Sequence, residues 1–131
     1  PARRMLRAMK PRPSSTPPAA VEHAWRLWLW LDASLPNLPA FARASAGAHA
    51  VDAALALLGA LTAASWAPRD SPDARAALAR ANGRVAFLRL VLRGMRERAY
   101  FSAAQHEHVA ALNERVGRMV GAWLRATKGA S

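Results

Sequence analysis

The chain has 131 residues, 53% of them hydrophobic, and its 19 Lys and Arg against 8 Asp and Glu give a formal net charge of +11. This length fits one ordinary domain, and the charge favours a polyanionic partner, which is a nucleic acid, an anionic membrane surface or an acidic protein. The absence of cysteine excludes disulfides, thiolate metal sites and a cysteine nucleophile, and it agrees with the reducing cytoplasm, where we expect the protein to act.

Residues 1–18 differ from the rest of the chain, because they hold five bases, five prolines and no acid. The prolines block regular structure, so a disordered basic arm is predicted. Residues 19–131 keep 14 bases against 8 acids and are therefore basic without the arm. The basic start runs into prolines and no run of about 18 uncharged apolar residues occurs, so we expect neither a secretory signal nor a transmembrane helix.

The first helix is predicted from Thr16 or Pro17 to about Ser34, because Thr16 is a suitable N-cap and proline is tolerated in the first turn. The stretch 25–31 is apolar nearly all round, which is typical of a helix buried on more than one side. In a small bundle this indicates a subunit interface beside the core. We expect that interface at Trp25, Trp28 and Trp30.

The second helix is predicted from about Ala40 to Trp66, after a proline-containing break at residues 35–39. Steps of three and four predict that its apolar seam consists of Phe41, Ala44, Ala48, Val51, Leu55, Leu58 and Thr62. The seam is rich in alanine, so we expect a neighbouring helix to approach closely.

The third and fourth helices have clear start signals. Ser71 before Pro72 predicts a helix from Pro72 to about Ala99, and Ser102 with Gln105 forms a capping-box pattern for a helix from Ala103 to about Thr127. Their predicted core faces are Ala74, Leu78, Ala81, Val85, Leu88, Leu92, Met95 and Ala99, and then Val109, Leu112, Val116, Met119 and Trp123. Four amphipathic helices with short connections predict an all-α fold, an antiparallel up-down four-helix bundle over residues 19–131.

No residues have the spacing of a catalytic or metal site. His106 and His108 stand at i and i+2 of a predicted helix and point about 200° apart, whereas a zinc helix needs i, i+4 spacing. The acids show no general acid/base spacing, and no glycine-rich phosphate loop is present. We therefore expect a binding protein rather than an enzyme, with no catalytic residue, metal or cofactor.

Arginine is the strongest functional signal. The third helix has seven arginines against Asp73 and Glu97, in two stripes that flank the apolar seam. An ordinary solvated face would mix the two signs of charge more evenly, so contact with a polyanion is favoured. The stripes are Arg75, Arg89, Arg93 and Arg96 on one side and Arg80, Arg84 and Arg98 on the other. The predicted binding residues are Arg80, Arg84, Arg89, Arg93 and Arg96, with Arg115, Arg118 and Arg125 of the fourth helix.

The last quarter of the chain carries a specific motif. Residues 98–102 read R-A-Y-F-S, Gln105 follows, and residues 116–125 read V-G-R-M-V-G-A-W-L-R. This ending resembles that of the Avd family, the accessory variability determinants of diversity-generating retroelements, which has an aromatic-x-Ser helix start and an "xIGRMLGGWL" helix. Ala122 stands in place of a glycine of that pattern. A more generic similarity, which includes Leu35-Pro36 and Arg84, covers about residues 20–128.

The resemblance implies a four-helix bundle that assembles as a ring-shaped homo-pentamer with a basic surface. It implies binding to the retroelement's reverse transcriptase, its template RNA and the cDNA, in support of mutagenic retrohoming, while the polymerase supplies the chemistry. The related bundle proteins encoded in intervening sequences of 23S ribosomal RNA genes share much of the pattern and are one alternative. A basic interaction bundle for another polyanionic partner, including a membrane surface, is another.

Overall fold

A computed structural model describes residues 16–128, and within this range every regular element is a helix. The four long helices are α2 (Thr16–Ser34), α4 (Ala48–Trp66), α5 (Pro72–Glu97) and α6 (Ala103–Lys128). The predicted all-α helical bundle is thus confirmed. The predicted basic arm lies mostly outside the described residues, except that positions 16–18 form the first turn of α2.

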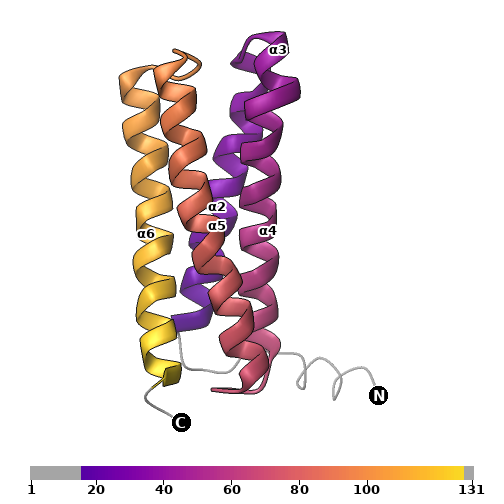
Figure 1. The fold of residues 1–131 in the computed structure, drawn as a ribbon, viewed down its shortest axis with the longest axis vertical. Coiled ribbons are helices and arrows are strands. Elements are labelled where there is room, and N and C mark those ends of the chain that lie inside the picture. Colours follow the sequence, from indigo (N-terminus) through magenta and orange to yellow (C-terminus); the bar gives the residue numbers. More distant parts are fainter. Residues whose placement is uncertain (1–15, 129–131) are drawn as a thin grey trace.

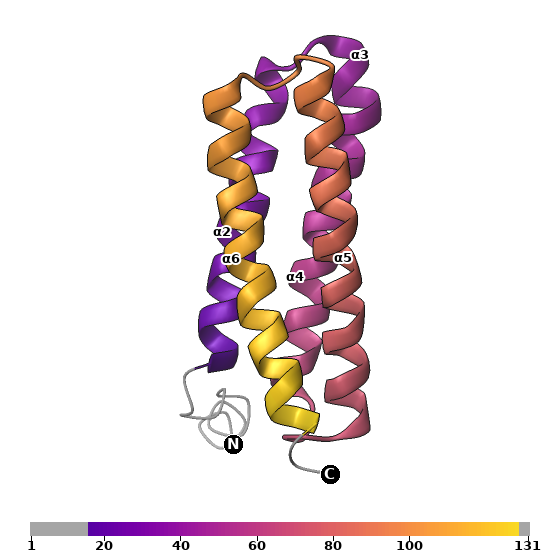
Figure 2. The same cartoon turned by 60° about the vertical axis from the view of Figure 1, so that its left-hand side comes forward.

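Each long helix packs against two others around one core (Figure 1). The contacting pairs are α2 with α4, α4 with α5, α5 with α6, and α6 with α2. Figures 1 and 2 show α3 and the α5–α6 connection at one end of the bundle, and the α4–α5 connection at the other end. The largest fully buried side chains come from all four helices and the α5–α6 connection; they are Leu27, Leu31, Leu57, Leu61, Leu78, Leu88, Leu92, Met95, Phe101, Val109, Val116 and Val120.

The predicted starts of α5 and α6 are confirmed at the level of hydrogen bonds. The Ser71 hydroxyl accepts from the Ala74 amide at 3.1 Å. At α6 the Gln105 amide donates to the Ser102 hydroxyl at 3.1 Å, and the Ser102 amide donates to Gln105 Oε1 at 2.8 Å, which is a complete capping box. Two short polar motifs therefore fix where these helices begin.

The end of α5 differs from its prediction. The helix ends at Glu97, and Ala99 is exposed with a φ of 60° instead of continuing the buried seam. The Tyr100 amide donates to the Met95 carbonyl at 2.8 Å and the Ala99 amide to the Arg96 carbonyl at 3.0 Å. This is a Schellman closure, in which one left-handed residue reverses the chain and takes its side chain off the helix face.

The predicted seam of the second helix is mostly wrong, because Val51 and Leu58 pack against the core but none of the seven predicted residues is fully buried. Phe41 and Leu55 are 62% and 51% exposed. The buried face of α4 consists instead of Ala50, Ala53, Ala54, Leu57, Ala60, Leu61 and Ala64. Residues 53–64 are apolar or small all round, so no polar position marks the outward face, and periodicity alone leaves the rotation of the helix undetermined.

A π-helical turn also shifts the register before α4 begins. The chain leaves α2 through η1 (Leu35–Asn37, a 3-10 turn), enters α3 (Ala40–Ala42) and then forms η2 (Arg43–Gly47, a π-helix). A π-turn holds an extra residue, which rotates everything that follows relative to a seam counted from position 41. Arg43 fixes the turn, because its Nη1 donates to the Leu38 carbonyl at 3.0 Å.

One described segment, Ala40–Trp66, is long and apolar enough to cross a membrane by length and composition, although no such helix was expected from the sequence. The core helix of a soluble protein meets the same criteria. Here the segment packs against α2 and α5, and Leu57 and Leu61 are completely buried.

Candidate nucleic-acid interface

Formal charge divides the bundle into two halves. Counted over their residues, α5 carries +4 and α6 carries +2, whereas α2 and α4 each carry −1. The two positive helices pack against each other and lie side by side in both views (Figures 1 and 2). One half of the molecule therefore presents the positive field to solvent.

Four arginines of α5 already contact groups within the protein. Arg75 and Arg96 donate to the carbonyls of Asp70, at 2.8 Å, and Phe101, at 3.4 Å. Arg93 pairs with Glu97 one turn away at 3.2 Å. The fourth is Arg89, whose ion pair crosses to α6. These arginines are less free to receive a phosphate than the sequence alone indicates.

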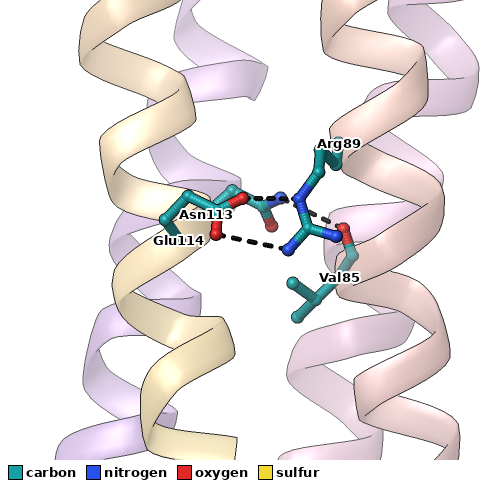
Figure 3. Close-up of polar contacts among 4 residues, drawn as sticks. All are labelled: Val85, Arg89, Asn113 and Glu114. Atoms are coloured by element: carbon teal, nitrogen blue, oxygen red, sulfur yellow. Dashed lines mark hydrogen bonds and ion pairs between the residues drawn. The ribbon is translucent and has the colours of Figure 1, made fainter.

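The ion pair of Arg89 is bidentate (Figure 3). Its Nε and Nη2 donate to the two carboxylate oxygens of Glu114 at 2.7 and 3.2 Å. The hydrogen bond from Arg89 lowers the pKa of Glu114 below its ordinary value, and the carboxylate raises the pKa of Arg89. Beside this pair, Asn113 Nδ2 donates to the Val85 carbonyl at 3.1 Å. These contacts join α5 to α6.

Five of the eight predicted binding arginines have no carboxylate within ion-pair distance among residues 16–128, and all five are exposed. They are Arg80 and Arg84 of α5, and Arg115, Arg118 and Arg125 of α6. Guanidinium groups in this state offer planar forks of donors that match phosphate oxygens. The structure therefore divides the predicted set into five available arginines and three that are engaged, Arg89, Arg93 and Arg96.

Arg80 and Arg84 border a surface hollow between α5 and α4. Its other wall consists of Ala56, Gly59 and Ala60, and its volume is about 310 Å³. Small side chains on α4 leave this space open beside the two guanidinium groups. The α4 wall was not predicted from the sequence, because the predicted seam puts the buried face of this helix elsewhere.

A second hollow lies at the same α4–α5 junction, closer to the α5–α6 connection. Its lining includes the apolar side chains of Phe87, Val91 and Met95 and the polar side chains of His49, Arg98 and Tyr100. Its volume is about 440 Å³, and Phe87 remains 46% exposed. The sequence does contain a signal for it, since Phe87 is a large apolar residue outside the predicted seam.

The three predicted interface tryptophans have different surroundings. Trp25 is 43% exposed. Trp28 is half-buried against the core, and its indole N–H has no acceptor among the described residues. Trp30 packs on Phe101 and His108 of the same chain, with ring centroids 5.4 and 5.7 Å away. Of the three, Trp25 exposes the most surface for a second subunit.

Large apolar side chains are exposed on both α2 and α4. Trp25, Leu29 and Leu55 are between 42% and 51% exposed. Leu55 is one helical turn before Gly59, which lines the hollow beside Arg80 and Arg84, so Leu55 lies towards the α5 side of α4. We refer to these three exposed side chains, Trp25, Leu29 and Leu55, as the α2/α4 apolar face.

The two histidines of the fourth helix contact different neighbours. His106 lines a hollow against Arg89 and Arg93 of α5, and His108 lies against Trp30 of α2. Across residues 16–128, no three His, Asp or Glu side chains gather in a way that would hold a metal ion.

The C-terminal motif is mainly a packing motif. Val116 and Val120 are buried, and a Cβ at Gly117 would lie 3.0 Å from Val85 Cγ1, so the glycine lets α6 approach α5. Ala122 is exposed, and its methyl group therefore fits where the Avd pattern has glycine. Arg118 is also exposed, so the motif contributes positive charge to the surface.

No protein-family model, curated protein or solved structure matches this chain. The similarity to the Avd family therefore rests on the residues of the motif themselves.

Proposed function

We propose that this chain is a non-catalytic accessory protein of a diversity-generating retroelement. As an antiparallel up-down bundle in the cytoplasm, it binds the reverse transcriptase, its template RNA and the cDNA through α5 and α6. The observation that carries the binding role is the set of exposed arginines without a carboxylate partner, Arg80, Arg84, Arg115, Arg118 and Arg125. The C-terminal motif supports the retroelement context.

Phosphate contacts would supply the affinity in this proposal. Arginine forks neutralise backbone phosphates and release their counterions, which gives strong but sequence-tolerant binding. Arg89 and Arg93 contribute less to the affinity, because a phosphate must first displace their carboxylate partners, Glu114 and Glu97. Specificity then comes from RNA shape and from the polymerase, and the chain itself needs no cofactor.

Self-association is the second part of the proposal. A second copy covers the α2/α4 apolar face, and repetition around a ring gives the homo-pentamer that the resemblance implies. Support comes from the charge division: α2 and α4 carry only −1 each, so two copies meet there without the repulsion that the arginines of α5 and α6 would cause. The ring then multiplies the positive field on its outer helices.

A salt-dependent RNA titration tests the binding role. The double variant Arg80→Gln/Arg84→Gln should bind a retroelement template RNA more weakly than the unmodified protein. Its slope of log K against log salt should be shallower by about 1.4 to 1.8, as expected for two lost phosphate contacts. The α6 variant Arg118→Gln/Arg125→Gln should show a similar loss.

Arg26→Gln is the matched control, because it removes one positive charge from α2, where Arg26 pairs with Glu22. It should bind RNA as the unmodified protein does. If both double variants keep full affinity and slope while remaining folded, the proposed interface is wrong.

A further inference from the structure

The α5 residues that line the two hollows at the α4–α5 junction follow one another along the helix. Arg80 and Arg84 are one helical turn apart, and Phe87 follows Arg84 after a rise of about 4.5 Å. Arg80 and Phe87, seven residues apart, lie almost on one line along the helix. A cationic hollow and an apolar hollow thus follow each other along α5, and we call the two together the groove.

Aromatic side chains line the apolar hollow and remain partly exposed. Phe87 is 46% exposed, and Tyr100 is held in place by Phe41 at 5.7 Å between ring centroids. Arg98 lies over the Tyr100 ring at 5.9 Å and adds a third cation beside the hollow. A volume of about 440 Å³ is in the range of pockets that hold small planar ligands.

We propose that this groove binds a single-stranded polynucleotide, with phosphates on Arg80 and Arg84 and one unstacked base against Phe87 in the apolar hollow. The inference rests on the proposed function and specifies its ligand as an unpaired stretch of template RNA or cDNA. Bases of a duplex are stacked inside the helix and cannot enter the hollow, whereas single strands present their faces to aromatic side chains.

Charge complementarity favours this occupant over an apolar protein segment. The groove is lined by Arg80, Arg84 and Arg98, and none of them has a carboxylate partner within residues 16–128. The one acid on the adjoining surface of α4 is Asp52, which forms no ion pair with the described residues and lies between His49 and Ala56 in sequence. Asp52→Asn should therefore strengthen strand binding.

The experiment compares three probes of equal length, about 12 nucleotides: a single strand, a duplex and an abasic sugar–phosphate strand. Comparing RNA and DNA versions of the single strand shows which of the two nucleic acids binds in the groove more tightly. The unmodified protein should bind the single strand more tightly than the other two probes. Phe87→Ala should weaken single-strand binding by about 5- to 150-fold, the range for one stacked base, and leave abasic binding and the salt slope unchanged.

Leu90→Ala is the matched control, since Leu90 is a 66% exposed apolar residue of α5 that does not line this hollow. It should leave all three affinities unchanged. If Phe87→Ala binds the single strand as the unmodified protein does, or if the abasic strand binds equally well, the base pocket is refuted while the arginine interface stands. Absence of salt-dependent binding to any probe would refute the proposed function as well.

Discussion

Among the glycines of the described residues, Gly47 has the most closely packed surroundings. A Cβ there would lie 2.9 Å from the Ala42 carbonyl oxygen and 2.9 Å from side-chain carbons of Leu35 and Leu38. One of these contacts is with backbone, which cannot rotate away. Glycine at this point lets the chain break at residues 35–39 pack directly onto the π-turn.

Gly47→Ala should therefore destabilise the protein by about 1–3 kcal/mol, the usual cost of overpacking a buried site. Urea unfolding followed by circular dichroism measures the change. Gly59→Ala is the control on the same run of helix, because nothing lies within 4 Å of its added Cβ. It should be neutral or stabilise the helix by up to about 1 kcal/mol. Equal losses for the two variants would contradict the packing at Gly47.

The Arg89–Glu114 pair predicts a pH-dependent contribution to stability. The pKa of Glu114 is lowered in the folded state, so its contribution is present above the ordinary carboxyl pKa of 4.5 and is lost as pH falls through the lower folded value. Both side chains are about half exposed, which limits the pair to roughly 0.5 kcal/mol. Glu114→Gln should lower the free energy of unfolding by that amount near neutral pH and leave it unchanged in strong acid.

Thermal unfolding of the two proteins across this pH range measures the difference. Glu107→Gln is the control, because Glu107 of the same helix forms no ion pair within the described residues. If Glu114→Gln is equally destabilised in strong acid, the loss of stability comes from packing and not from the ion pair.

At the scale of the helices, α5 and α4 show what a sequence can and cannot determine. In α5, charged residues alternate with apolar ones, so seven of the eight predicted seam positions, all but Ala99, are buried. In α4, Asp52 is the only formally charged residue, and alanines occupy both the buried and the exposed faces. The rotation of α4 was set by packing and by the π-turn, and neither leaves a periodic signal.

The sequence predicted the N-terminus of α6 through the capping box of Ser102 and Gln105, and both of its hydrogen bonds are present. Ser102→Ala removes the hydroxyl that accepts from the Gln105 amide, so it should cost about 1 kcal/mol in the free energy of unfolding. Ser65→Ala is the control, since the Ser65 hydroxyl donates to a carbonyl inside α4 and caps no helix. Urea titrations that show the same loss for both serines would contradict a special role for the capping box.

For the whole molecule, the sequence predicted the positive charge of α5 and α6 but not which arginines are available. Glu114 lies 25 residues from Arg89 in sequence, and only the packing of α5 on α6 brings the two together. The α4 walls of both hollows depend on the rotation of that helix, which was mispredicted. The sequence alone could therefore not predict the groove, which depends on how α4 and α5 pack together.

The proposed self-association through the α2/α4 apolar face predicts how the mass of the protein in solution responds to mutation. Leu55→Glu places a charge on that face and should shift the protein towards monomers, because a buried unpaired carboxylate is costly. Light scattering coupled to size exclusion measures the mass. Leu90→Glu, on the exposed side of α5, should leave the assembly intact. If only Leu90→Glu dissociates the assembly, the interface lies on α5 instead.

Co-purification with any reverse transcriptase encoded beside this gene, in the presence of its template RNA, is the most direct test of the accessory role. We expect a stable complex with several copies of this chain per polymerase, which Arg80→Gln/Arg84→Gln weakens and raised salt dissociates. A protein that remains alone, binding neither the polymerase nor the RNA at low salt, would contradict the accessory role.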